Sequence, residues 1–118
     1  MNNLVQISGL GAICASGMSP QALFDACLKG ESSVNSEGLA EISPDTFADL
    51  RTQTPENLKG SKCTVLAHRA FSQAFLDSGW SSDNLKQAGF IFATTTGKID
   101  LWEKVLCSYD SPALTAEN

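Results

Sequence analysis

The residues of this chain that could carry out covalent chemistry are its cysteines and its single histidine, His68. The cysteines are Cys14, Cys27, Cys63 and Cys107. A thiol becomes a nucleophile when a helix N-terminus, a cation or an imidazole lowers its pKa. Cys14 lies in a stretch of small residues, but the next expected helix begins only after Ser19, and no Lys or Arg is near Cys14 in the sequence. We therefore interpret Cys14 as a small packed residue and not as a catalytic thiol.

The histidine and the cysteine spacing bear on acid-base and metal chemistry. His68 is expected at the edge of an apolar helix face, and a catalytic dyad would also need a nucleophile within hydrogen-bond reach of it. The cysteines form no Cys-x-x-Cys pair, and with one histidine they offer no recognisable zinc site. Their wide spacing favours reduced intracellular thiols over a secreted scaffold with two disulfides. The sequence thus predicts no catalytic, cofactor-binding or metal-binding residue.

Two glycine-containing turns could bind phosphate, and both depart from the required patterns. In a dinucleotide-binding turn that begins Gly9-Leu10-Gly11, a third glycine would stand at position 14, where this chain has Cys14. A phosphate-binding loop that ends Gly97-Lys98 would need Gly at position 92 and Ser or Thr at position 99, but Phe92 and Ile99 stand there. We therefore interpret both turns as structural.

Composition and charge limit the class of protein. The chain has 118 residues, 42% of them hydrophobic, which suits one domain and excludes a multidomain enzyme. Its net charge of −5 disfavours binding to nucleic acid. No apolar run approaches the roughly 20 residues of a membrane span, and Ile13 is too large for the position before a processed lipoprotein cysteine. We expect a cytoplasmic protein without membrane contact.

Three helices are predicted among the elements that would position these residues. Ser19 and Pro20 predict the start of a helix that ends at Gly30. A longer amphipathic helix is predicted between a Ser61 cap and Gly79, and another over residues 99–109. Residues 31–60 are the least regular, with about one helical turn over residues 45–50, and residues 82–88 predict a short helix.

Two β-prone runs complete the expected elements. Residues 4–8 read as a strand entering a glycine turn, and the uninterrupted apolar run at residues 90–94 reads as an interior strand. Strands that alternate with helices predict an α/β fold with mainly parallel strands and packed helices. We expect the small residues Ala70 and Ala74 of the long helix to face that sheet, and Arg69 and Gln73 to face outward.

Several segments resemble the opening of β-ketoacyl-acyl-carrier-protein synthases. The segment VQISGLGA at residues 5–12, followed by Gly17 and the helix from Ser19 to Gly30, resembles the strand, TGLGA turn and first helix of that family. AFLDSGW at residues 74–80 resembles its A-L-x-D-A-G-L helix end, and FATTTG at residues 92–97 resembles its G-T-T-T-G-G strand exit. The motifs occur in the family order and spacing, up to about residue 103. Lys98 and Cys14-Ala15 depart from the family's second glycine and its Ser-Pro.

The resemblance implies that residues 1–118 are the N-terminal, incomplete part of a synthase-like domain, the opening of a thiolase-like fold. The full-length enzyme performs decarboxylative Claisen condensation of acyl and malonyl thioesters in fatty-acid or polyketide synthesis. Its catalytic Cys and two His would lie beyond Asn118, so the chain alone is expected to be inactive, without a cofactor. The implied partners are acyl carrier protein and the remaining synthase chain. The polar residues 111–118 provide no closing strand.

Two other hypotheses stay open at this stage. The chain could be a small autonomous binding or scaffold protein with a ketosynthase-like opening, or a small thiol enzyme that uses Cys14. If the chain is a segment of a synthase, uncovered apolar residues in the run 90–94 predict that it self-associates or is marginally stable. A monomer with a sharp, reversible unfolding transition at high temperature would favour an autonomous domain.

Overall fold

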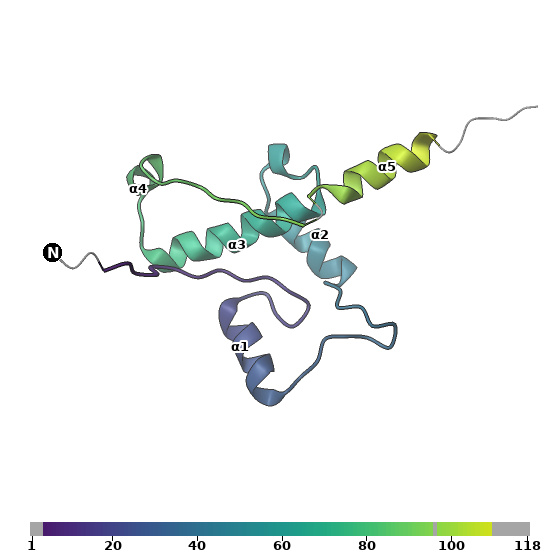
Figure 1. Cartoon of the computed structure of the whole chain (residues 1–118), viewed down its shortest axis with the longest axis horizontal. Coiled ribbons are helices and arrows are strands. Elements are labelled where there is room, and N and C mark those ends of the chain that lie inside the picture. The colour runs from purple at the N-terminus through teal and green to yellow at the C-terminus, as the bar shows by residue number, and fades with distance from the viewer. Residues whose placement is uncertain (1–3, 96, 110–118) are drawn as a thin grey trace, which may run out of the picture.

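The computed structural model of the chain describes residues 4–95 and 97–109. The helical elements, in order, are α1 (Pro20–Lys29), α2 (Pro44–Thr52), the 3₁₀ turn η1 (Glu56–Leu58), α3 (Lys62–Ser78), α4 (Ser82–Lys86) and α5 (Ile99–Tyr109) (Figure 1). Thr96 and residues 111–118, on which two expectations rested, lie outside the described residues. Within the described ranges, none of the helices has the length and apolar character that crossing a bilayer requires.

The predicted helix boundaries are confirmed for α1 and α3, and each has a local cause. The hydroxyl of Ser19 accepts the N–H of Ala22 at 3.2 Å, and Gly30 ends α1 with a φ of 67°. Ser61 caps α3 in the same way through the N–H of Thr64, at 3.2 Å, and Gly79 ends it, also with a φ of 67°. A left-handed backbone costs glycine least, so both glycines stop their helices.

The other three helices lie where they were predicted, but the bounds of α2 and α4 differ from the prediction. α2 is longer than the single turn expected, because Ser43 caps it and Pro44 suits its first position. α5 spans the predicted range, and α4 begins at the predicted residue.

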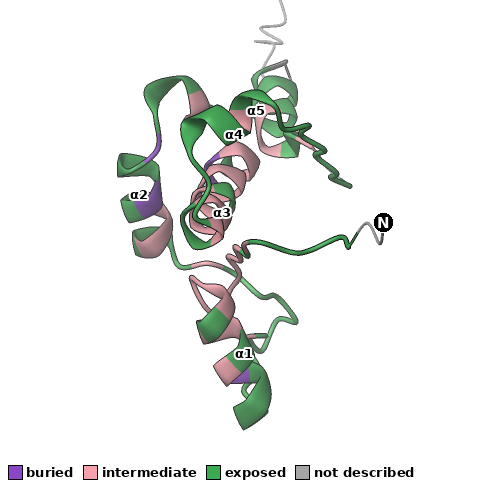
Figure 2. Cartoon of the chain, turned by 90° about the vertical axis from the view of Figure 1, so that its left-hand side faces the viewer, coloured by how far each residue is buried: buried purple, intermediate pink, exposed green. Residues whose placement is uncertain are grey.

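The buried core is small; Ala26 is buried on α1, and the rest of the apolar core lies where α2 meets α3. Leu50 of α2 is 6% exposed and Val65 of α3 is fully buried. Thr54 is also buried there, and its hydroxyl donates to the carbonyl oxygen of Leu50 at 2.8 Å. Figure 2 shows that most of the remaining ribbon is half-buried or exposed, with α1 set apart from α3. Few side chains therefore hold the helices together, and α3 is the helix against which α2 and η1 pack.

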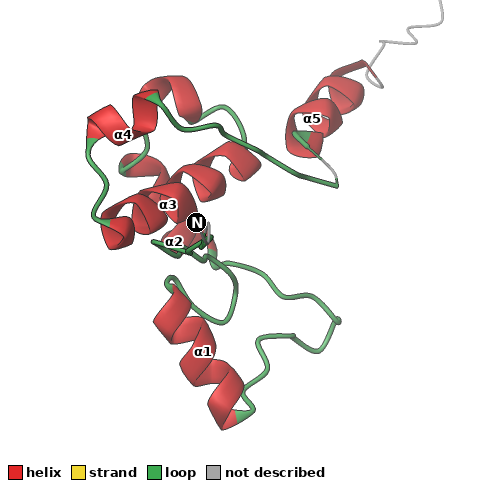
Figure 3. Cartoon of the chain, turned by 60° about the vertical axis from the view of Figure 1, so that its left-hand side comes forward, coloured by secondary structure: helices red, strands yellow, loops and turns green. Residues whose placement is uncertain are grey.

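The predicted sheet is wrong: the described residues contain helices and loops but no strand (Figure 3). Neither an α/β fold nor a thiolase-like arrangement of parallel strands is present. Residues 4–8 and 90–94 lie outside helices, as predicted, but they have no backbone partner. Ile91, expected in the interior, is 95% exposed, and Val5 is 99% exposed. A strand requires hydrogen bonds to a second backbone. The run over residues 90–94 instead packs on α3 through Phe90, whereas residues 4–8 are exposed and the chain approaches α3 only at Gly9 and Gly11.

Candidate functional site

Three of the sequence motifs that are distant along the chain meet on α3. The turn Gly9-Leu10-Gly11 crosses the C-terminal half of the helix, which itself carries the AFLDSGW motif. Residues 88–95 run along another side of α3 (Figure 1). The candidate site is therefore built around one helix.

Hydrogen bonds attach the loop of residues 9–18 to α3. The N–H of Leu10 donates to Oδ2 of Asp77 at 2.9 Å. The N–H of Ala12 donates to Oε1 of Gln73 at 3.1 Å, and Nε2 of Gln73 donates to the carbonyl oxygen of Met18. Gln73 therefore spans the loop by using both ends of its amide. The prediction that Gln73 faces outward is wrong, because the loop covers that side of the helix.

Glycine allows the loop to approach α3 closely. A Cβ atom on Gly9 would lie 2.1 Å from the carbonyl oxygen of Ala74, and one on Gly11 would lie 1.9 Å from that of Ala70. The carbonyls of Ala70 and Ala74 are four helical residues apart, about 6 Å along the helix axis. The loop covers this distance between Gly9 and Gly11, and two residues of a strand span about the same length. The backbone is therefore extended here. Ala70 and Ala74 lie at a close approach, as predicted, but against a loop and not a sheet.

Arg69 also differs from its predicted outward position. Its Nε atom is buried and has no hydrogen-bond partner among the described residues. The side chain lines a cavity beside the loop together with Met18, Gln73 and Asp77. The start of α1 and the loop over residues 9–18 therefore cover Arg69 and Gln73, two α3 residues that the helical periodicity placed in solvent.

Aromatic rings fill the other side of α3. The rings of Phe71 and Phe75 stack with centroids 6.3 Å apart, and Phe90 meets Phe71 edge-on at 5.9 Å. The ring centroids of Phe90 and Phe92 are 6.4 Å apart, and the two ring planes are inclined by 10°. Side chains two residues apart share a side only in an extended backbone, so residues 90–92 are extended as well. Edge-to-face and offset aromatic pairs stabilise such contacts by about 1 kcal/mol each.

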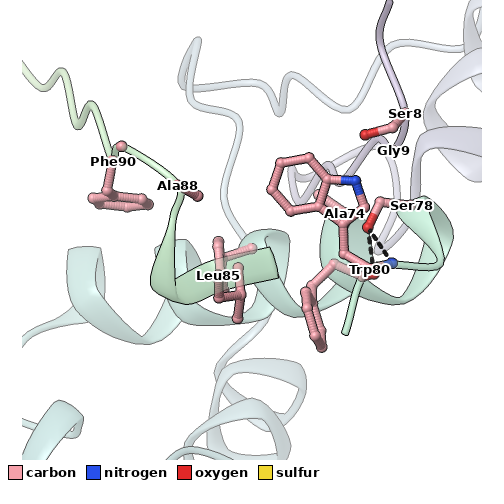
Figure 4. Close-up of a pocket in the computed structure, with 11 residues that line it drawn as sticks. Ser8, Gly9, Ala74, Ser78, Trp80, Leu85, Ala88 and Phe90 are labelled. Atoms are coloured by element: carbon pink, nitrogen blue, oxygen red, sulfur yellow. Dashed lines mark hydrogen bonds between the residues drawn. The ribbon is translucent and has the colours of Figure 1, made fainter. Parts of the chain in front are cut away.

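A cavity of about 370 Å³ lies between the two extended runs. Ser8 and Gly9 line one side of it, Gly89 and Phe90 line another, and Ala74 of α3 lies between them (Figure 4). None of the residues that line it is charged. The cavity therefore suits an uncharged, mainly apolar occupant.

A second cavity, of about 460 Å³, brings together groups that could do chemistry. Cys63, His68 and Lys98 line it, with Phe71 and Phe92 among its apolar walls. Within the described residues, no hydrogen bond links the thiol of Cys63 to the imidazole of His68, so the pair is not assembled as a nucleophile and base. Sequence reasoning missed this juxtaposition because Lys98 reaches α3 only through the tertiary arrangement.

The remaining thiols are spread over the molecule. Cys14 is half-buried and closes a tight turn, with its N–H donating to the carbonyl oxygen of Gly17 at 2.9 Å. Cys27 and Cys107 are exposed. All four cysteines are unpaired, and the described ranges contain no cluster of three or more potential metal ligands. The contacts that the described residues make at the candidate site are therefore packing contacts and hydrogen bonds.

Comparison with known proteins found no match to this chain among family models, curated proteins or solved structures.

Proposed function

We propose that the chain serves as the N-terminal, non-catalytic segment of a β-ketoacyl-acyl-carrier-protein synthase. The observation that carries the proposal is the contact between the resembling motifs. Leu10 of the glycine turn is hydrogen-bonded to Asp77 of the AFLDSGW motif, although 67 residues separate them. Phe90, beside the third motif, packs on Phe71 one turn before AFLDSGW. The three segments that resemble this family therefore lie together around α3.

Asp77 has the most specific role in this proposal. Its carboxylate accepts the N–H of Leu10 at 2.9 Å, which fixes the glycine turn at the end of the helix. A carboxylate is a stronger acceptor than a neutral group, so the acid of the motif strengthens this hydrogen bond. The segment would thereby present the two extended runs to the remaining synthase chain.

The chemistry itself would come from residues that the resemblance assigns outside this chain, a Cys and two His. That Cys would take an acyl group from a carrier-protein thioester, and decarboxylation of a malonyl thioester would supply the attacking carbanion. The present chain would contribute binding surface and position. Acyl carrier protein and the remaining synthase chain are the proposed partners.

A thioester assay tests whether the chain acts alone. The purified chain should neither condense acyl and malonyl thioesters nor release CO₂ from a malonyl thioester, and an acyl-thioester probe should not label it stoichiometrically. Turnover that disappears in Cys14→Ala but persists in the exposed-thiol control Cys27→Ala would contradict the proposal and favour a small thiol enzyme.

The encoding reading frame separates the proposal from its alternative. A frame that continues into a Cys and two His supports a synthase, and a natural stop after Asn118 supports an autonomous binding or scaffold protein. The uncharged cavity between the two extended runs is the feature that favours the alternative.

A further inference from the structure

Two residues of opposite charge line one cavity beside α3 without forming an ion pair. Arg69 and Asp77 both line a cavity of about 690 Å³ between α3, the loop over residues 9–18 and the start of α1. The described ranges contain three ion pairs, and neither residue belongs to any of them. Arg69 and Asp77 are eight residues apart on α3, about 12 Å along the helix axis. The cavity therefore presents a cation and a carboxylate that do not neutralise each other.

The guanidinium group of Arg69 lacks an acceptor. Its Nε atom is buried and has no hydrogen-bond partner within the residues that the structure describes. A buried charged group is stabilised when a counter-charge lies against it, and Asp77 is the only acid among the residues that line this cavity. An anion at the remaining guanidinium nitrogens would supply the missing counter-charge. A carboxylate suits this role best, because its two oxygens accept two parallel hydrogen bonds from arginine.

The carboxylate of Asp77 has acceptor capacity that the loop does not use. Its Oδ2 atom accepts the N–H of Leu10 at 2.9 Å, and among the described residues Oδ1 has no donor. The side chain is also exposed. A carboxylate accepts up to about four hydrogen bonds, and an ammonium group carries donors alone. A ligand with an ammonium end would therefore bind Asp77 without displacing the loop.

The rest of the cavity wall combines apolar side chains with a free backbone donor. Leu10 is 57% exposed and Leu76 is 77% exposed, so both offer apolar surface that the described chain leaves uncovered. The N–H of Gln21, in the first turn of α1, has no acceptor within the described ranges. An extended peptide carries apolar side chains together with backbone carbonyls, and thus matches both features.

We propose that this cavity binds a short peptide with free termini, whose carboxylate pairs with Arg69 and whose ammonium group pairs with Asp77. An extended chain covers about 3.3 Å per residue, so three or four residues span the separation of about 12 Å. An inorganic anion would leave Asp77 unpaired, and an uncharged apolar compound would leave both charges unpaired. The site requires no synthase chemistry and does not depend on the proposed function.

Isothermal titration calorimetry of the 118-residue chain tests the proposal without any substitution. The probe is the tetrapeptide Ala-Leu-Leu-Ala, titrated with free termini, in an N-acetylated form and in a C-amidated form. The free peptide should bind about tenfold more tightly than either blocked form, because each block removes one charge-assisted contact. Equal affinity for the free and blocked peptides, or no saturable binding up to about 5 mM, would overturn the proposal.

Two variants assign each end of the peptide to its residue. Arg69→Met keeps the apolar stem, and it should bind the free and C-amidated peptides equally while N-acetylation still weakens binding. Asp77→Asn keeps an oxygen for the N–H of Leu10, and it should bind the free and N-acetylated peptides equally. Arg51→Met is the matched control, because Arg51 is exposed on α2 and removes the same charge away from the cavity.

The control should bind the free peptide as the unsubstituted chain does, and circular dichroism should show the same helicity in all variants. An Arg51→Met variant that loses as much affinity as Arg69→Met would overturn the assignment, because a general charge effect would then explain the binding. So would an Arg69→Met variant that still prefers the free peptide to its C-amidated form.

Discussion

Replacing Gly11 with alanine tests the close contact between the loop and α3. The new Cβ would lie 1.9 Å from the carbonyl oxygen of Ala70 and 2.8 Å from its carbonyl carbon. Both are backbone atoms of a helix and cannot turn aside. Ordinary contact needs about 3.5 Å, so the loop must retreat by about 1.5 Å. The hydrogen bond from Ala12 to Gln73, now 3.1 Å long, would then break.

The expected cost of Gly11→Ala is about 1 to 3 kcal/mol of unfolding free energy, the range for forced overpacking. Urea denaturation followed by circular dichroism measures it, and faster exchange of the Ala12 amide reports the local loss. Gly60→Ala is the control, because nothing lies within 4 Å of its added Cβ. That variant should gain up to about 1 kcal/mol through a less flexible unfolded chain. Equal stability of the two variants, with unchanged exchange at Ala12, would refute the packing of the loop on α3.

Three further predictions concern single side chains. Gln73→Ala should lower the unfolding free energy measured in urea by about 1 to 2 kcal/mol, because two hydrogen bonds are lost. The control Gln6→Ala, in the exposed run over residues 4–8, should change that free energy by less than about 0.5 kcal/mol. Val65→Ala should cost about 2 kcal/mol by the same measurement, because it opens a cavity at the one fully buried large side chain of the described residues; a neutral result would contradict the α2–α3 core. The hydrogen bond and charge of Lys59 lower the pKa of the Glu56 carboxyl. Lys59→Ala should therefore raise that pKa in an NMR titration. The stabilisation by this pair is present above the unfolded-state pKa of Glu56, and it is lost as the pH falls through the lowered pKa of the folded state.

The helical periodicity of α3 predicts the direction of some of its side chains and not of others. The apolar stripe of α3 correctly places Phe71 and Phe75 on one packed side. It wrongly leaves Arg69 and Gln73 in solvent, because a second surface, the loop over residues 9–18, covers the opposite side of the helix. A single stripe indicates one buried face, but a polar residue that hydrogen-bonds a loop backbone leaves no apolar signal.

The sequence by itself determined where α1 and α3 begin and end. The caps at Ser19 and Ser61 and the stops at Gly30 and Gly79 act over three or four residues, so the local sequence contains all that they require. Only the tertiary structure decided whether the extended runs over residues 4–8 and 90–94 pair as strands. β-prone composition predicts an extended backbone, but a strand exists only when a second backbone lies at pairing distance. In the described chain residues 90–94 pack on α3 through Phe90, and residues 4–8 stay exposed; neither run pairs with a second backbone. Contacts such as Gln73 to Ala12, across 61 residues, likewise depend on the tertiary arrangement.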